Sequence, residues 1–200
     1  MSPDTAPYLV VGLGNPGADY DGTPHNFGFV LLAELARRAA IRLRTRECRS
    51  LTGRGQLAGR PVWLAAPMTY MNLSGEAVQQ LLAKQPVAGW MVACDDVDLP
   101  FGALRLRERG SAGSHNGLRS LVACLGTQEF TRLRLGIGVD HPIADLAGFV
   151  LSRWSKSQQT RADEVAQTAA DAVECALERG LAAAMNRYNA PGAAQTSQGN

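Results

Sequence analysis

The chain has 200 residues and a formal net charge of +2, and 46% of its residues are hydrophobic while 19% are charged. This length most often forms one domain with a sizeable core, and the composition excludes a disordered chain, a collagen-like chain and a coiled coil. The longest nearly apolar run, residues 87–94, is far shorter than the roughly 20 residues that a membrane span needs, so we expect no membrane segment.

The first residues and the cysteines favour a cytoplasmic protein. Residues 1–7 have neither the basic and apolar pattern of a secretory signal nor the arginines of a transit peptide. The four cysteines form no C-x-x-C pair, which favours reduced thiols over a zinc site or a disulfide framework. We expect a flexible N-terminus over residues 1–7, one domain over 8–190 and a disordered tail over 191–200.

Apolar runs and turn residues predict strands that alternate with helices. In chain order these are a strand over 8–13, a helix from about 26 to 39, a hairpin of 51–57 and 62–66, a helix capped by Asn72 or Ser74 and stopped by Pro86, a strand over 90–94, an edge strand over 103–107, a helix that begins near His115 and has Gly126 at its end, a strand over 133–139, and two or three helices between 143 and 188. The pattern predicts a single α/β domain with a twisted mixed, largely parallel sheet flanked by helices on both faces.

Three glycines after the first predicted strand raise the hypothesis of a dinucleotide-binding oxidoreductase. Gly12, Gly14 and Gly17 fit G-x-G-x-x-G. That fingerprint needs a helix at the third glycine to hold a pyrophosphate, whereas residues 18–25 include a glycine and a proline. It also needs an acid after the next strand, where this chain is rich in arginine. We therefore expect no dinucleotide cofactor.

Three acids after the predicted strand over 90–94 form a second candidate site. Asp95, Asp96 and Asp98 fall at the end of a strand, where open α/β sheets form their sites, and carboxylates can bind magnesium. The only lysines are Lys84 and Lys156, and the chain has no glycine loop with lysine for phosphoryl transfer. The acids can equally cap the following loop, so we predict no metal site.

The three histidines have different settings in the sequence. His25 lies outside the carboxyl end of the first strand, where the crevice of the sheet is expected. His115 begins a helix, where capping or phosphate contact is as plausible as catalysis. His141 falls in an Asp-His-Pro turn. The positions favour His25 as a catalytic candidate.

Four polar residues share the position of His25 relative to the sheet. They lie after strands or at the starts of the following helices and are Asn15, Asn72, Asp95 and Asn116. Such positions converge in space, so they predict a general base, an orienting carboxylate and neutral hydrogen-bond donors. The sequence has no G-x-S-x-G elbow and no recognisable Cys-His pair, which favours direct attack by water with His25 as base.

With these residues assembled, the sequence resembles the bacterial peptidyl-tRNA hydrolase family. Several separate motifs match in the same order, which makes the resemblance specific over nearly the whole ordered chain. The matching segments are 10–28, 67–78, 95–121, 130–138, 149–154 and 184–189.

The resemblance implies an esterase that cleaves the bond between a peptide and the 3′-terminal ribose of tRNA, with peptidyl-tRNA and tRNA as partners and no cofactor. It assigns His25 as the catalytic base and Asp95 as the carboxylate that orients it. It further implies that three asparagines bind substrate and water and that one tyrosine lies near the tRNA end of the site; these residues are Asn15, Asn72, Asn116 and Tyr20.

Arginines form two groups along the chain. Eight of the 18 arginines fall between Arg37 and Arg60, and their role is left open between a nucleic-acid footprint and the codon usage of a GC-rich genome. In the second group, the resemblance implies that Arg105 and Arg107 clamp tRNA phosphates.

Two further arginines lie two positions apart at the start of the predicted strand over 133–139. Arg132 comes just before this strand and Arg134 lies within it. They either add to the tRNA clamp or form a solvated face.

Some residues depart from the family pattern. Pro24 stands where arginine is usual, Ser114 where glycine is common and Cys94 where histidine is frequent. Pro24 is expected to weaken a contact near His25, and Ser114 to stiffen the loop over 110–114. The main alternative is an RNA-binding protein on the same fold that does not hydrolyse its ligand, and the retained site residues favour the enzyme, which we expect to be a monomer.

Overall fold

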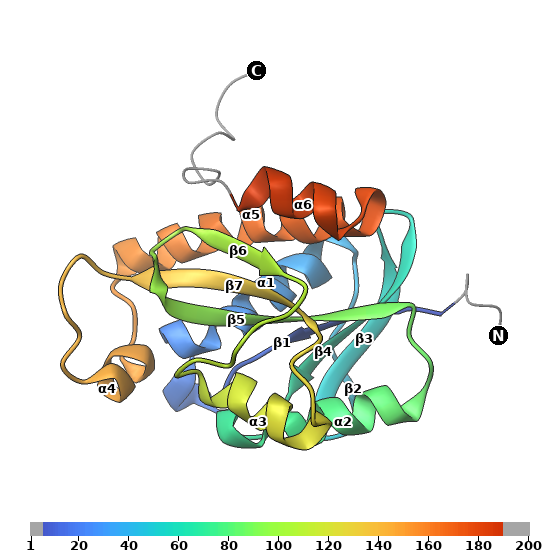
Figure 1. Cartoon of the computed structure of the whole chain (residues 1–200), viewed down its shortest axis with the longest axis horizontal. Helices are drawn as coiled ribbons and strands as arrows, with labels where there is room; N and C mark the ends of the chain where they lie inside the picture. The colour runs from blue at the N-terminus through green and yellow to red at the C-terminus, as the bar shows by residue number, and fades with distance from the viewer. Residues whose placement is uncertain (1–5, 190–200) are drawn as a thin grey trace.

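The computed structural model describes residues 6–189, and its centre is a seven-stranded mixed sheet in the order β2-β3-β4-β1-β5-β7-β6 (Figure 1). The strands are β1 (Tyr8–Gly12), β2 (Thr45–Glu47), β3 (Ser50–Leu57), β4 (Arg60–Pro67), β5 (Gly89–Pro100), β6 (Leu104–Arg107) and β7 (Thr131–Gly138). Most of the expected N-terminal segment, residues 1–5, and the whole expected tail over 191–200 lie outside the described residues.

Within residues 6–189, six α-helices and three short 3-10 helices connect and cover the strands. The α-helices are α1 (Phe27–Arg38), α2 (Ser74–Lys84), α3 (Asn116–Leu125), α4 (Leu146–Leu151), α5 (Lys156–Arg179) and α6 (Leu181–Tyr188). The 3-10 helices are η2 (Ala18–Tyr20), η3 (Pro24–Asn26) and η4 (Met71–Leu73). In the part of the chain that the structure describes, no helix has the length and apolar character needed to cross a membrane.

The sheet is parallel at its centre and antiparallel at its edges. β1 lies between β4 and β5 and runs parallel to both, and β5 runs parallel to β7. β3 pairs antiparallel with β2 and β4, and β6 pairs antiparallel with β7. The prediction of a mixed sheet is therefore confirmed, with its parallel character confined to the four central strands. Their carboxyl ends meet at one edge of the sheet.

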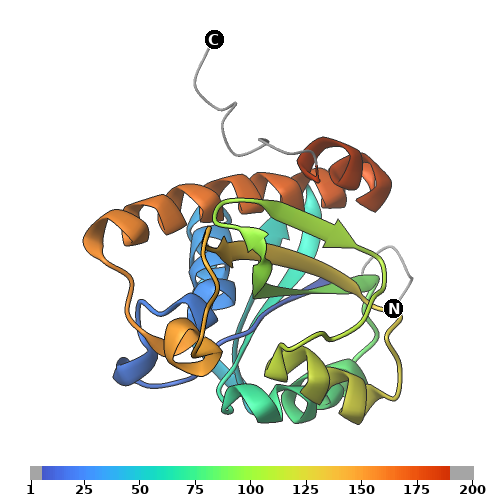
Figure 2. The ribbon, with the colours of Figure 1, turned by 60° about the vertical axis from the view of Figure 1, so that its left-hand side comes forward.

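Helices cover both faces of the sheet, as the sequence predicts. Successive side chains of a strand point to opposite faces, so Val10 of β1 packs in a core with α1, α5 and α6, while Leu9 and Val11 pack in a second core with α2 and α3. Figure 2 shows the sheet between the long helix α5 and the pair α2 and α3. Two apolar cores thus hold the carboxyl edge of the sheet in place.

Two glycines allow α1 to pack closely on β1. A Cβ on Gly12 would meet the backbone oxygen of Gly28 at 2.2 Å, and one on Gly28 would meet the backbone of Leu13 at 2.4 Å. The glycine run after β1 therefore serves close packing. The segment that follows holds the short helices η2 and η3 instead of a long helix at Gly17, which agrees with the rejection of a dinucleotide site.

Local differences from the predicted elements have simple causes. Neither Asn72 nor Ser74 caps α2, because η4 runs directly into that helix and Leu73 takes the cap position without a side-chain hydrogen bond. β2 was not predicted, since its three residues are polar and largely exposed. β5 continues to Pro100 through the acidic run, with a register shift between Asp96 and Pro100.

Candidate active site

The polar residues expected at the site follow the carboxyl ends of the parallel strands. Asn15 follows β1, Asn72 follows β4 in η4, and Asp95 lies within β5. His25 is the middle residue of η3, which leads into α1. The topology therefore brings these segments to the same edge of the sheet, as the sequence predicts.

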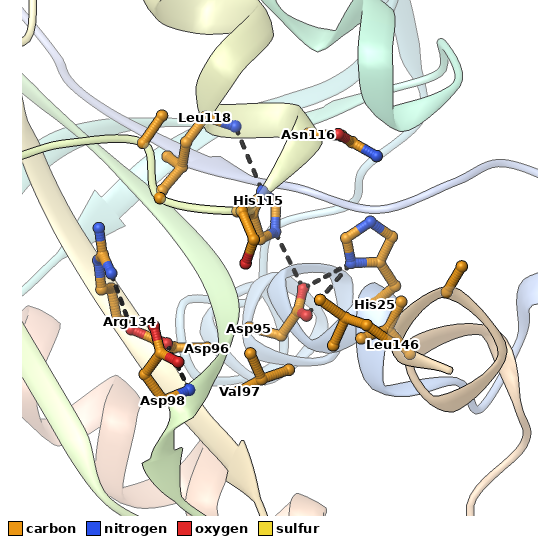
Figure 3. A pocket seen from close by; sticks show the side chains of 15 residues that line it. His25, Asp95, Asp96, Val97, Asp98, His115, Asn116, Leu118, Arg134 and Leu146 are labelled. Atoms are coloured by element: carbon orange, nitrogen blue, oxygen red, sulfur yellow. Dashed lines mark hydrogen bonds and ion pairs between the residues drawn. The ribbon is translucent and has the colours of Figure 1, made fainter. Parts of the chain in front are cut away.

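His25 and Asp95 form a buried hydrogen-bonded pair (Figure 3). The Nδ1 atom of His25 lies 2.9 Å from Oδ1 and 3.2 Å from Oδ2 of Asp95. The two residues are only 8% and 3% exposed, respectively. An Nδ1–H group that donates to a carboxylate leaves the Nε2 atom of a neutral imidazole as a proton acceptor. The pair thus has the arrangement of a base and its orienting carboxylate.

A second imidazole, His115, contacts the same carboxylate. Its Nε2 atom lies 3.1 Å from Oδ1 of Asp95, and its Nδ1 atom accepts a hydrogen bond from the backbone N–H of Leu118 at 3.2 Å. For His115 the sequence leaves capping, phosphate contact and catalysis open, and the structure shows the cap at the start of α3. Its contact with Asp95 could not be predicted from the sequence, because that contact depends on how α3 packs beside β5.

The charge of Asp95 is stabilised within the protein. Burial alone would raise the pKa of its carboxyl group, but the electrostatic attraction and hydrogen bonds of the His115 and His25 rings outweigh burial and hold the pKa well below its usual range. Asp95 is therefore an ionised acceptor of hydrogen bonds at neutral pH.

The same three side chains have the donor types of a metal site. Ligand atoms of His25, Asp95 and His115 lie within 4.8 Å of one another. A metal-bound nitrogen needs a free lone pair, however, and the N–H of Leu118 already occupies the Nδ1 lone pair of His115. The Nε2 atom of His115 then carries the proton, so the observed arrangement fits a hydrogen-bonded carboxylate better than a metal ion.

The imidazole–carboxylate cluster opens into a cavity of about 230 Å³. Asn116, at the first position of α3, lines this cavity together with His25, and Leu146 of α4 forms part of its apolar wall (Figure 3). The cavity also borders the loop that carries Ser114. A reacting group that enters this partly apolar cavity can therefore reach the imidazole of His25.

Asn15 is fixed beside this cluster by hydrogen bonds on both sides. Its side-chain Oδ1 accepts from the backbone N–H of Met71 at 2.7 Å. Its backbone N–H donates to Oδ1 of Asn26 at 2.7 Å, and Nδ2 of Asn26 donates to the backbone oxygen of Asn15 at 3.0 Å. Since Asn26 follows His25 directly, this network joins the β1 loop to the turn that carries the imidazole. The network does not use the amide nitrogen Nδ2 of Asn15, which remains a donor that faces away from these partners.

Asn15 borders a different cavity from His25. This second space, of about 240 Å³, is lined by Asn15 and by apolar residues that include Met68. Asn72 is exposed on η4, which packs against α3. Tyr20 is half-buried and meets the ring of Tyr70 edge-on at 6.3 Å. The structure therefore brings His25, Asp95 and Asn116 to one cavity, whereas Asn15 borders the second cavity and Asn72 and Tyr20 line neither of the two.

Arg105 and Arg107 lie on the exposed side of the edge strand β6 and line a third cavity of about 600 Å³.

The two arginines of β7, Arg132 and Arg134, do not form a solvated face. Arg132 is 0% exposed. Its guanidinium donates to the backbone oxygen of Gly110 at 2.6 Å. The two arginines therefore help to hold the chain that leads into the loop over 110–114.

Arg134 links that loop to the acidic strand. Its Nη1 atom donates to Oδ2 of Asp96 at 2.9 Å, and its Nη2 atom donates to the backbone oxygen of Ser111 at 2.7 Å. Asp96 also accepts a hydrogen bond from the backbone N–H of Asp98. Because these partners engage Asp96 while Asp95 faces two imidazoles, the acids do not form one shared carboxylate cluster.

Cys94 is unsuited to nucleophilic attack. Its side chain is buried, and burial together with the neighbouring negative charge of Asp95 raises the pKa of its thiol far above the usual range. A thiol in this environment stays protonated at neutral pH. This agrees with the expectation that water attacks directly.

Together, the sheet with a parallel centre and the imidazole–carboxylate pair at its carboxyl edge define an α/β enzyme of the hydrolase class. The model of the peptidyl-tRNA hydrolase family matches residues 9–198, and the chain belongs to that family. Similar curated proteins include the peptidyl-tRNA hydrolases of Koribacter versatilis, 48% identical over 90% of this chain and 92% of the relative, and of Roseiflexus castenholzii, 50% identical over 92% and 87%.

A solved structure has the same fold. The crystal structure of peptidyl-tRNA hydrolase from Acinetobacter baumannii matches with a TM-score of 0.82 at 36% identity, covering 93% of this chain and 96% of that chain. The resemblance stated from the sequence motifs is therefore confirmed at the level of family and fold.

Proposed function

We propose that this chain hydrolyses the ester bond between a peptide and the 3′ ribose of tRNA, with His25 as a metal-independent general base. The observation that carries this proposal is the buried contact between His25 and Asp95, since it leaves Nε2 of the imidazole available to take a proton. The family membership supports the substrate and the reaction class.

The reaction needs only a positioned water and a base. Water attacks the ester carbonyl carbon while Nε2 of His25 takes its proton, and the carbonyl oxygen becomes an oxyanion. When the tetrahedral intermediate collapses, the bond to the ribose oxygen breaks and that oxygen takes the proton from His25. Asp95 stabilises the positive charge that the imidazole carries between the two steps.

Neutral donors around the pair bind the substrate. The outward amide nitrogen of Asn15 is held by the bond between its oxygen and Met71, so it can donate to a carbonyl oxygen without first being ordered. Asn116 borders the same cavity as His25 and serves to position the water. Asn72 and Tyr20 contact the peptide backbone and the tRNA end from the neighbouring loops.

Phosphates of the tRNA bind at Arg105 and Arg107. Both are exposed on an edge strand and border a wide open cavity. Arginine suits this role because its planar guanidinium forms paired hydrogen bonds with phosphate oxygens. The enzyme acts as a monomer in the cytoplasm, where its substrate arises during translation.

The test is release of labelled peptide from a purified N-blocked aminoacyl-tRNA, with EDTA present and with His25→Ala alongside. We expect release by the wild type in EDTA and a loss of roughly 10²–10⁴-fold in kcat for the variant, which is the usual contribution of a general base. Binding of tRNA by His25→Ala should remain close to wild type.

Two outcomes would contradict the proposal. Turnover by His25→Ala at a substantial fraction of the wild-type rate would exclude His25 as the base. Binding without release by the wild-type chain would favour the alternative of a non-catalytic RNA-binding protein.

A further inference from the structure

His115 engages both of its ring nitrogens. Nδ1 accepts the backbone N–H of Leu118 in the first turn of α3, and Nε2 faces Oδ1 of Asp95. A neutral imidazole has one acceptor nitrogen and one donor nitrogen. Because Nδ1 accepts, Nε2 carries the proton and donates to Asp95. The helix cap therefore selects the tautomer that His115 presents to the site.

Asp95 receives an N–H donor from each of two elements. His25 approaches its Oδ1 atom from η3 at 2.9 Å, and His115 approaches the same atom from the start of α3 at 3.1 Å. The two rings lie 4.9 Å apart between centroids and are tilted by 48°. Because both donors meet on Oδ1, a rotation of the carboxylate that moved this oxygen would disturb both contacts, so the two donors together hold its orientation.

Other charged side chains near Asp95 form ion pairs with different partners. Within residues 6–189, the ion pairs of Asp95 are those with His25 and His115. The adjacent acid, Asp96, pairs with Arg134 and accepts a hydrogen bond from the backbone N–H of Asp98. The orientation of Asp95 therefore depends on the two imidazoles and not on a guanidinium.

We propose that His115 is a positioning residue for the hydrolysis: its Nε2–H group holds the carboxylate of Asp95 in the orientation that keeps His25 aimed as the base. His115 acts through Asp95 and does not itself exchange a proton with the substrate. This inference rests on the proposed function, because it assigns a role relative to His25 as base.

Two variants separate the capping role of His115 from its contact with Asp95. In His115→Asn, the side-chain oxygen can still cap α3, since asparagine is a favoured capping residue, but the side chain is too short to reach Asp95. In His115→Gln, the amide nitrogen takes the approximate place of Nε2 and can donate to Asp95. His141→Asn, at an exposed histidine outside the site, is the matched control.

The measurement is kcat and KM for peptide release from N-blocked aminoacyl-tRNA by the full chain. We expect His115→Asn to lower kcat by about tenfold, a fraction of the whole contribution of a general base, with KM within twofold of wild type. His115→Gln should restore kcat to within about threefold, and His141→Asn should match the wild type. In the background of Asp95→Asn, the further change from His115→Asn should shrink to less than twofold.

Two results would overturn the proposal. One is an unchanged kcat in His115→Asn, which would leave His115 with only its helix cap. The other is a full tenfold further loss in the background of Asp95→Asn, because His115 would then act independently of the carboxylate. The proposed function fails by a different result, namely wild-type turnover in His25→Ala, so the two failures are distinguishable.

Discussion

At the scale of single residues, the site could be predicted as far as residue type and position in the sheet allow. His25 lies in the connection that follows β1 and Asp95 lies within the adjacent parallel strand β5, so their approach is a consequence of topology that apolar runs already indicate. The contact of His115 with Asp95 could not be predicted in this way. It depends on the packing of α3 against η4 and β5, which no local pattern encodes.

Arg132 and Arg134 illustrate a second limit at this scale. Alternating arginines on a strand suggest one exposed face, yet the side chain of Arg132 is fully buried. Backbone carbonyl oxygens of the 110–114 loop region satisfy its charge. Burial and the nearby charge of Arg134 lower the pKa of Arg132. A buried cation of this kind is recognisable only when its partners are known.

Asn15 allows a test that separates folding from substrate binding. Asn15→Asp keeps a side-chain oxygen for the N–H of Met71 but removes the outward amide donor and adds a negative charge. We expect kcat/KM to fall by about 10²-fold, the size of effect seen when one oxyanion donor is removed. The thermal unfolding midpoint should stay close to wild type.

Asn15→Ala is the comparison for that variant. It loses the bond to Met71 as well, and an unsatisfied buried N–H costs about 1–3 kcal/mol, so its unfolding midpoint should fall. Wild-type kcat/KM in Asn15→Asp would show that the amide nitrogen does not contact the reacting group.

At the scale of elements, the central strands and the main helices were predictable because each has a strong apolar pattern. β1 is almost entirely buried, and such short apolar runs mark the centre of a parallel sheet. Elements without that pattern were missed or shortened. β2 is polar and short, and the end of β5 is acidic, so neither has the periodicity on which prediction depends.

The arginine-rich segment from Arg37 to Arg60 is partly structural. Arg38 pairs with Glu34 in its own helix and with Asp171 of α5. Arg54 pairs with the acid of β2 and lies over the ring of a buried tryptophan at 4.3 Å. These ion pairs join α1 to α5 and β3 to β2, which explains part of the arginine enrichment without a nucleic acid.

The edge strand β6 provides the test of tRNA binding. Arg105→Ala with Arg107→Ala should weaken binding of substrate and reduce the slope of log K against log salt by about two, since each phosphate contact contributes about one to that slope. The measurement is binding of peptidyl-tRNA to an inactive His25→Ala chain across a salt series.

Arg42→Ala with Arg44→Ala is the matched control for the edge strand, because it removes the same charge from another exposed segment. An equal fall in slope for both pairs would mean that binding follows overall charge. An unchanged slope for the β6 pair would place the phosphate contacts elsewhere.

At the scale of the whole molecule, the exposed large apolar side chains gather near the candidate site. Among the described residues they are Met68, Tyr70, Leu73, Leu146 and Leu151. Three of them lie between β4 and the start of α2, and Leu146 borders the cavity of His25. We expect this divided apolar surface at the mouth of the site to serve the substrate and not a subunit interface.

We therefore expect a monomer. Sedimentation velocity of the full chain should give one species of about the monomer mass across a hundredfold range of concentration. A dimer that dissociates on addition of substrate would contradict this expectation, since it would place the same apolar side chains in a subunit interface.

Pro24 gives the turn of His25 a property that hydrogen bonds alone would not supply. It is the first residue of η3, is buried, and stands directly before the imidazole. Its ring restricts φ to about −65° in every state of the chain, and a first helical position needs no N–H group. The turn therefore loses less conformational entropy when it forms. The stiffness of the backbone before His25 limits how far the turn can move when thermal motion loosens the bond to Asp95, so we expect the turn to keep its conformation as the temperature rises.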